Sequence, residues 1–279
     1  MYMKRQNRRW LLRCSLLLVA VLLLSMLSLP VLAARPVLVF GVVPQQSAAR
    51  LAAQWMPLLD VWGDIVGVEF RFATAPDIPT FEARLKAGEY DLAYMNPYHF
   101  TLFHQSPGYR ALARARDKRI TGILVAKKNW QGDLTQLEGQ TLAFPAPRAF
   151  AATVLTQSEL DAAGIHYQPQ YVGSHDSVYL SVAKGLFPAG GGVIRTFNSL
   201  PDALRNELTV IHHTARYTPH AVAYHPKLDA ATVSRLRQSI ALLDQHAGAA
   251  VAFSQLNIKG WQLAADQDWD DVAALGIRR

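Results

Sequence analysis

The chain has very little cysteine. Its 279 residues include one, Cys14, which precedes an uncharged run from Ser15 to Leu29, whereas a lipoprotein cysteine would follow such a run. From residue 34 onward there is no thiol, which excludes a disulfide, a thiolate nucleophile and a cysteine metal site in that part. An ordinary apolar core must hold it together, and 51% hydrophobic residues can supply one.

Acidic residues are missing from the first 33 residues, which carry five of the 28 Lys and Arg side chains. This basic start, the uncharged run and the small residues Ala33 and Ala34 are the three parts of a secretory signal peptide. We predict a signal peptide over residues 1–33, cleaved after Ala33 or Ala34, and a periplasmic protein. The uncharged run is long enough to rival a membrane span, so an uncleaved N-terminal anchor facing the periplasm is the alternative.

The part of the chain after residue 33 has almost no net positive charge. Subtracting its five basic side chains leaves 23 Lys and Arg against 21 Asp and Glu, so the net charge falls from +7 to about +2. Nucleic-acid binding requires a basic patch, and so nearly balanced a chain gives no sign of one. We therefore expect no nucleic-acid partner.

Motifs for catalysis and metal binding are also absent. The nine histidines include no His-Glu-x-x-His run, and the adjacent His212 and His213 should point to opposite faces of a strand. Ser174, His175 and Asp176 are consecutive and so cannot stack as nucleophile, base and orienting acid. We predict no catalytic residue, no enzyme activity, no metal and no cofactor, and we assign Asp176 to capping the helix that follows.

Hydrogen-bonding side chains crowd the end of one apolar strand. The run from Leu92 to Met95 breaks at Asn96 and Pro97, because proline cannot donate to a sheet ladder. Ligands of open α/β sheets sit at the carboxyl ends of strands, which makes the polar residues here binding candidates. These candidates are Tyr94, Asn96, Tyr98 and His99. The alternative is a simple turn with aromatic packing around it.

Strands alternate with helices through the rest of the chain. Strands are expected at 37–43, 68–73, 92–95, 111–116, 120–127, 141–144, 171–172, 193–194, 208–213 and 217–224. Helices are expected at 48–62, 78–88, 97–104, 148–163, 178–184, 230–245 and 249–256, and a flexible loop at 188–192.

This alternation predicts an α/β protein with two lobes, each a mostly parallel sheet flanked by helices. Crossing segments near residues 114–121 and 214–219 would divide the chain into lobe 1, residues 35–116 plus 218–279, and lobe 2, residues 117–217. The cleft between the lobes is the natural binding site.

Four segments carry a resemblance to a known family. They are Phe40-Gly41-Val42-Val43-Pro44, Tyr90-Asp91-Leu92-Ala93-Tyr94-Met95-Asn96-Pro97, Leu137-Glu138-Gly139-Gln140-Thr141-Leu142-Ala143-Phe144 and Gly173-Ser174-His175-Asp176-Ser177. With these segments in this order, the chain resembles the phosphate, phosphite and phosphonate periplasmic binding proteins of ABC importers. The resemblance covers nearly all of the chain after the signal segment and implies the type II periplasmic binding fold.

The resemblance also implies a function. We expect an extracytoplasmic solute-binding protein, monomeric, that closes its lobes around a small anionic ligand resembling phosphonate, phosphite or phosphate and delivers it to an ABC permease. The alternative is a sensory protein that presents its bound state to a membrane sensor kinase, because both functions use the same closure.

The resemblance further implies where the ligand sits: at a loop after the first strand, a tyrosine after the third, a Ser/Thr-rich helix start in the second lobe, and a histidine. At that helix start this chain has Ala149-Phe150-Ala151-Ala152-Thr153, so backbone N–H groups replace most hydroxyl donors and Phe150 offers an aromatic face. Arg148 would add anion affinity if it turned inward rather than into solvent. The expected ligand-binding residues are Gln46, Ser47, Tyr94, Asn96, Tyr98, Phe150, Thr153 and His175.

Overall fold

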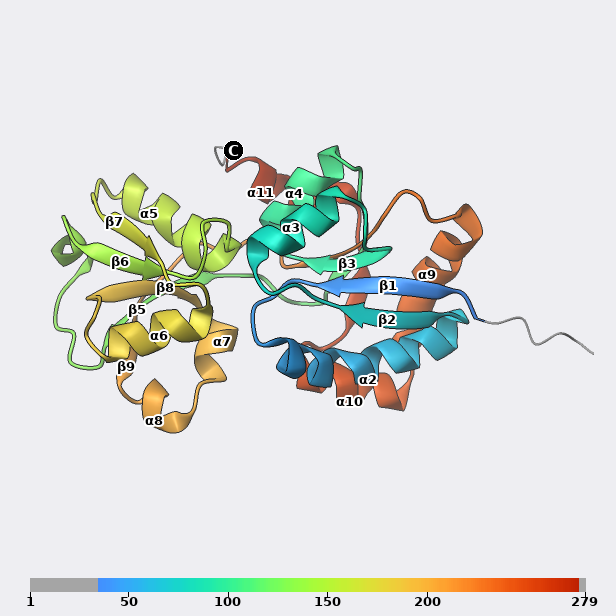
Figure 1. Ribbon diagram of the computed structural model, residues 1–279, viewed down its shortest axis with the longest axis horizontal. Coiled ribbons are helices and arrows are strands. Elements are labelled where there is room, and N and C mark those ends of the chain that lie inside the picture. The colour runs from blue at the N-terminus through green and yellow to red at the C-terminus, as the bar shows by residue number, and fades with distance from the viewer. Residues whose placement is uncertain (1–34, 276–279) are drawn as a thin grey trace, which may run out of the picture. The chain divides into compact units, whose positions relative to one another are not determined.

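Two β-sheets flanked by helices make up residues 35–275, the part of the chain that our computed structural model describes (Figure 1). The signal peptide predicted over residues 1–33 lies outside the described residues. Within residues 35–275, no helix is both long enough and apolar enough to cross a membrane.

The first sheet has six strands and draws them from both ends of the described chain. Its strand order is β11-β4-β10-β3-β1-β2. The strands are β1 (Val37–Val42), β2 (Glu69–Ala73), β3 (Leu92–Met95), β4 (Arg110–Ala115), β10 (Ala221–Tyr224) and β11 (Trp261–Leu263). Strand β1 pairs in parallel with β2 and β3, whereas β10 runs antiparallel between β3 and β4.

The second sheet has five strands, all from the middle of the chain. Its strand order is β7-β6-β8-β5-β9. The strands are β5 (Gly122–Lys127), β6 (Thr141–Phe144), β7 (Gln168–Tyr171), β8 (Ala189–Val193) and β9 (Leu208–His213). Strand β6 pairs in parallel with β7 and β8, whereas β5 runs antiparallel between β8 and β9.

The predicted fold class, a two-lobed type II α/β fold, is confirmed. Most strands of each sheet run in one direction, but the hydrogen-bonded pairs are mixed because β5, β10 and β11 run against their neighbours. Both β5 and β10 follow a segment that crosses from the other sheet. These crossing segments pair through Ile120 and Tyr217, whose N–H groups donate to each other's carbonyl oxygens at 2.8 and 2.9 Å. The residue numbers predicted for the two lobes stay a prediction.

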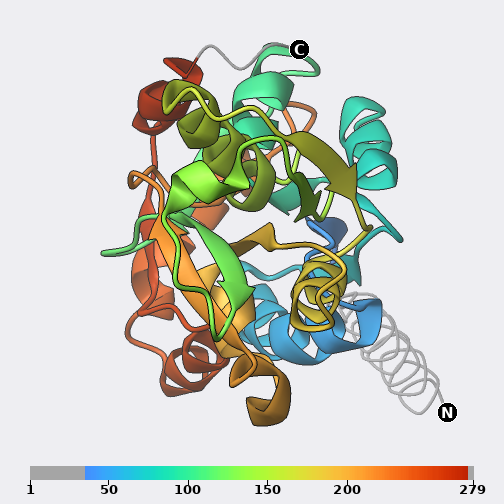
Figure 2. The same cartoon turned by 90° about the vertical axis from the view of Figure 1, so that its left-hand side faces the viewer.

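Helices cover both faces of each sheet (Figures 1 and 2). Around the first sheet lie α2 (Ala48–Val66), α3 (Ile78–Lys86), α4 (Pro97–Gln105), α9 (Ala230–Leu243), α10 (Ala247–Gln255), a 3₁₀ helix (Asp266–Trp269) and α11 (Asp270–Ala273). Around the second lie a 3₁₀ helix (Leu134–Leu137), a π-helix (Phe150–Leu155), α5 (Thr156–Ala162), α6 (His175–Ala183), α7 (Ile194–Asn198) and α8 (Asp202–Arg205).

The longest helix within residues 35–275, α2, shows why these elements form where they do. Ser47 precedes it and accepts a hydrogen bond from the Arg50 N–H, and Gly67 ends it in the left-handed conformation, with φ of 78°. Its buried Trp55 and Trp62 pack against Trp261, with ring centroids 6.4 and 5.1 Å apart. This aromatic cluster ties α2 to the last strand of the first sheet.

The loop predicted at residues 188–192 and the strand predicted at 193–194 are both wrong. Residues Ala189–Val193 form the buried strand β8 in the middle of the second sheet, and Ile194 begins helix α7. The glycines of β8 serve close approach rather than flexibility. A Cβ on Gly191 would lie 1.8 Å from the Ala152 carbonyl oxygen, so only glycine lets the π-helix rest on the strand.

Gly191→Ala should therefore destabilise the protein severely. The atom that the new methyl group meets belongs to the backbone and cannot rotate away, so we expect a loss of about 3 kcal/mol or more in the free energy of unfolding. Urea denaturation would measure it. Gly139→Ala is the matched control, because Gly139 has a φ of +71° but open space around it. Its cost should be only about 1–2 kcal/mol, and equal losses in the two variants would contradict the packing argument.

Candidate ligand-binding cleft

Two adjoining cavities lie where residues of the two sheets meet. The Arg195 cavity has an empty volume of about 550 Å³, solvent-open space included, and its lining includes Tyr94, Lys118, Ile194, Arg195, Thr196 and Pro219. The helix-start cavity has about 290 Å³, measured in the same way, and its lining includes Asn96, Ala149, Phe150, Ala151, Ala152 and His175. Both are also lined by Gln45, Ile120, Val193 and His220, so they are neighbouring compartments of one cleft.

Four of the eight predicted binding residues line this cleft. They are Tyr94, Asn96, Phe150 and His175. The other four do not line either cavity. Gln46 and Ser47 follow the cavity-lining Gln45, Ser47 caps α2, and Tyr98 is buried in α4. Thr153 is fully buried and donates its hydroxyl hydrogen to the Ala146 carbonyl oxygen at 2.8 Å. A ligand-binding role for any of the eight stays a prediction.

Tyr94 forms part of a stacked wall with His220, a residue that the sequence analysis missed. The two rings are 4.9 Å apart and nearly parallel, and Trp55 packs on Tyr94 at 4.6 Å. The Gln45 amide nitrogen lies 3.1 Å from Nε2 of His220. Burial, followed by the charge of Arg195, holds the pKa of His220 well below its usual value, so this imidazole is neutral at pH 7.

His175 lies in the first turn of α6 and is also buried. Ser174, not Asp176, caps this helix: its hydroxyl oxygen accepts the Ser177 N–H at 3.1 Å, so the predicted Asp176 cap is wrong. Asp176 instead stands inside the first turn, two positions after the cap. Burial, followed by the charge of Arg195, lowers the pKa of His175 to about 4. Its Nδ1 atom is buried without a hydrogen-bond partner among the described residues.

The helix start at Ala149 presents backbone rather than hydroxyl groups. Ala149, Phe150, Ala151 and Ala152 are all buried, and the N–H groups of Thr153 and Val154 both donate to the Ala149 carbonyl oxygen. The first N–H groups of a helix have no acceptor within that helix. These groups carry the positive end of the helix dipole, so the helix-start cavity favours an anion.

The charged side chains that line the cleft are all basic. No Asp or Glu is among the described residues that line either cavity. Arg119 pairs with Asp271 at 3.0 Å, and Lys118 donates to the Asn257 carbonyl oxygen at 2.7 Å. Burial, followed by the charge of Arg195, lowers the pKa of Lys118 to about 8. Arg195 was not among the predicted binding residues, because residues 193–194 were predicted as a strand and α7 was not predicted.

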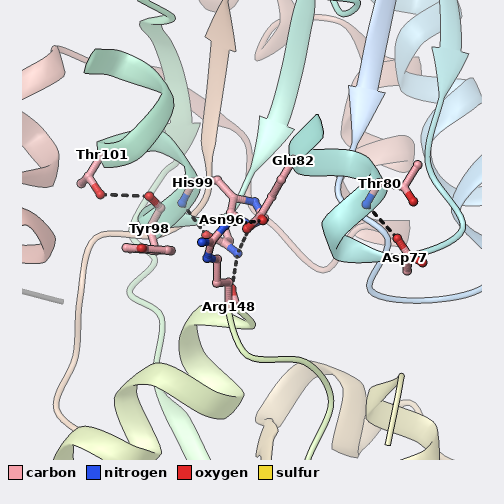
Figure 3. Close-up of polar contacts among 8 residues, drawn as sticks. All are labelled: Asp77, Thr80, Glu82, Asn96, Tyr98, His99, Thr101 and Arg148. Atoms are coloured by element: carbon pink, nitrogen blue, oxygen red, sulfur yellow. Dashed lines mark hydrogen bonds and ion pairs between the residues drawn. The ribbon is translucent and has the colours of Figure 1, made fainter. Parts of the chain in front are cut away.

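Arg148 turns away from both cavities and joins the lobes instead (Figure 3). Its guanidinium donates to the Glu82 carboxylate of α3 at 2.8 Å, and its carbonyl oxygen accepts the Asn96 amide hydrogen at 3.2 Å. Nε2 of the buried His99 lies 3.1 Å from the other Glu82 oxygen. Burial alone would raise the pKa of Glu82, but His99 and Arg148 together hold it below its usual value.

Comparison with known proteins identifies the family. The sequence profile described as "ABC transporter, phosphonate, periplasmic substrate-binding protein" matches residues 40–269. The chain belongs to this family. It is a family of transport binding proteins rather than of enzymes, and its members are periplasmic.

Individual relatives are more distant. The phosphate-import protein PhnD of Mycolicibacterium smegmatis is 26% identical over 172 residues, which are 53% of this chain and 52% of that protein. The chain thus matches about half the length of this relative.

Two solved structures share the fold. A phosphonate-transporter binding protein of Pseudomonas aeruginosa aligns with a TM-score of 0.78 at 15% identity, covering 87% of this chain and 86% of the other. PhnD1 of Prochlorococcus marinus, solved with methylphosphonate, aligns with a TM-score of 0.78 at 18% identity, covering 86% and 97%.

Acidification should destabilise the protein through His175. An unfolded histidine binds a proton near pH 6.5, whereas His175 does so only near pH 4. Between these pH values the unfolded state binds a proton at this histidine and the folded state does not. The free energy of unfolding is therefore highest above pH 6.5 and decreases as the pH falls toward 4. His175→Gln should remove about 2 kcal/mol of the loss between about pH 7 and pH 5.

Urea denaturation at the two pH values would measure the difference. His213→Gln, at an exposed histidine, is the control and should keep the wild-type dependence. An identical pH dependence in His175→Gln and the wild type would refute a buried, neutral His175.

Proposed function

We propose that the protein closes its two lobes around a small anionic ligand of the phosphonate or phosphate type and delivers it to an ABC permease. The observation that carries this proposal is the composition of the cleft: basic residues, neutral imidazoles and a helix start, with no described carboxylate lining either cavity. A buried anion needs several hydrogen-bond donors, and this cleft offers them without an opposing negative charge.

The helix start is the expected seat of the oxyanion. Backbone N–H groups at Phe150 to Ala152 need no hydroxyl side chains to bind an anion, so the alanines here are compatible with a phosphonate. His175 lines the same cavity and would donate from its ring. Asn96 also lines it, and because its side chain already binds the His99 N–H and the Arg148 carbonyl oxygen, we expect it to position the cleft wall rather than to contact the ligand first.

The wall of the cleft supports a ligand with an organic part. Burial raises the pKa of Tyr94, so its hydroxyl keeps its proton and can donate a hydrogen bond. Phe150 packs edge-on against Tyr217 at 6.1 Å and offers apolar surface at the helix start. A methyl or methylene group bonded to phosphorus suits this surface better than water does.

The proposal also covers export, oligomeric state and turnover. Export by the segment 1–33, a monomeric state, and stoichiometric binding without turnover are part of the proposal. The sensory alternative is not favoured, because the matching family is one of transport proteins.

Calorimetric titration of the protein lacking residues 1–33 with methylphosphonate, phosphite and phosphate tests the proposal. At least one should bind, and His175→Gln should weaken that binding about 10-fold or more, because a hydrogen bond to a charged group contributes about 1.5–3 kcal/mol. His213→Gln is the control, because His213 is exposed and outside both cavities. No binding of any of the three anions, or unchanged affinity in His175→Gln, would refute the site.

A further inference from the structure

Arg195 carries a charge that nothing in the described protein neutralises. It stands in the first turn of α7 and lines the Arg195 cavity. The nearby arginines have carboxylate partners, Arg119 at Asp271 and Arg148 at Glu82. Within residues 35–275, no carboxylate lies within ion-pair distance of Arg195, and its side chain makes no hydrogen bond there. A partly buried guanidinium without a partner is costly, so its place in a binding cleft points to a ligand.

The neighbours of Arg195 increase this cost. Lys118 lines the same cavity, and the charge of Arg195 contributes to lowering the pKa of Lys118 as well as those of His175 and His220. Two cations and two imidazoles thus share a small space. An anion placed among them would relieve their repulsion and form charge-assisted hydrogen bonds.

One oxyanion cannot serve both ends of the cleft equally. The helix start and His175 line one cavity, and Arg195 and Lys118 line the other. Ile120 and Val193 line both cavities, so the surface shared by the two compartments is partly apolar. This order of polar, apolar and basic surface matches a molecule with two anionic ends joined by a short hydrocarbon spacer.

We propose that the Arg195 cavity is a second anion subsite and that the ligand is a phosphonocarboxylate. The phosphonate group would occupy the helix start, the methylene spacer would lie against Ile120 and Val193, and the carboxylate would bind Arg195. A planar guanidinium matches a carboxylate through two parallel hydrogen bonds, which favours this group at Arg195. The inference rests on the proposed function, since it assigns a second group to a ligand held at the helix start.

Calorimetric titration of the protein lacking residues 1–33 tests this assignment. The ligands are methylphosphonate, phosphonoacetate, 3-phosphonopropionate, methylenediphosphonate and 2-aminoethylphosphonate, all at pH 7.5. We expect the better of the two phosphonocarboxylates to bind at least 10-fold more tightly than methylphosphonate. 2-Aminoethylphosphonate should bind more weakly than either phosphonocarboxylate, because it would place an ammonium group beside Arg195.

Arg195→Gln isolates the second subsite. It should weaken binding of the better phosphonocarboxylate at least 10-fold and change the affinity for methylphosphonate less than threefold. Arg237→Gln is the matched control, because it removes the same charge from an exposed position on α9 outside both cavities. It should leave both affinities unchanged.

The outcomes separate this inference from the proposed function. If methylphosphonate binds as tightly as the phosphonocarboxylates, or Arg195→Gln weakens both to the same degree, the second subsite is refuted while the anion-binding function stands. Tighter binding of methylenediphosphonate than of both phosphonocarboxylates would refute the carboxylate assignment. No binding of any phosphonate, phosphite or phosphate would refute the proposed function and this inference together.

Discussion

The cleft depends on a backbone-to-backbone contact between two strands of the second sheet and the π-helix that covers them. A Cβ on Gly122 of β5 would lie 2.1 Å from the Ala151 carbonyl oxygen, and one on Gly191 of β8 would lie 1.8 Å from that of Ala152. Only bare backbone lets the helix approach so closely. This contact fixes the height of the helix start above the sheet, and therefore where its N–H groups meet the cleft.

Much of the fold could be predicted from local sequence, because periodicity and turn residues act over short distances. The apolar run Leu92–Met95 forms β3 with the predicted bounds, and α2 begins at residue 48 as predicted. Strand β8 could not be predicted in this way. Its glycines show no apolar periodicity and normally indicate a loop. They are required here because the π-helix, about 40 residues earlier in the chain, packs directly against the strand backbone. Close approach of distant backbone leaves no local pattern.

The residues of the cleft also differ in whether the sequence alone could indicate them. Tyr94 was predicted because it stands at a strand end that the sequence marks, whereas Phe150 and His175 were predicted from the resemblance; all three line the cleft. Gln45 lies in the loop that the resemblance indicated, but its neighbours Gln46 and Ser47 were predicted as the contacts, because no period fixes which side chain of a loop turns inward. His220 and Arg195 belong to a crossing segment and to a short helix, and their importance comes from the residues that surround them. Arg148 was considered as an anion donor, but an ion pair with the distant Glu82 fixes its direction.

The bridge between Ile120 and Tyr217 ties the two crossing segments together at one point, and residues of the same segments, Ile120, Pro219 and His220, line the cleft. Any rotation of one lobe against the other bends the backbone beside this tie and moves the cleft wall with it. Under the proposed function, a ligand in this cleft would lie beside the bridge and would act on the rotation through a very short lever arm. The bridge between Ile120 and Tyr217 and the ion pair between Arg148 and Glu82 consist of different residues. The stiffness of the crossing segments and the strength of the contact between the lobes can therefore change independently.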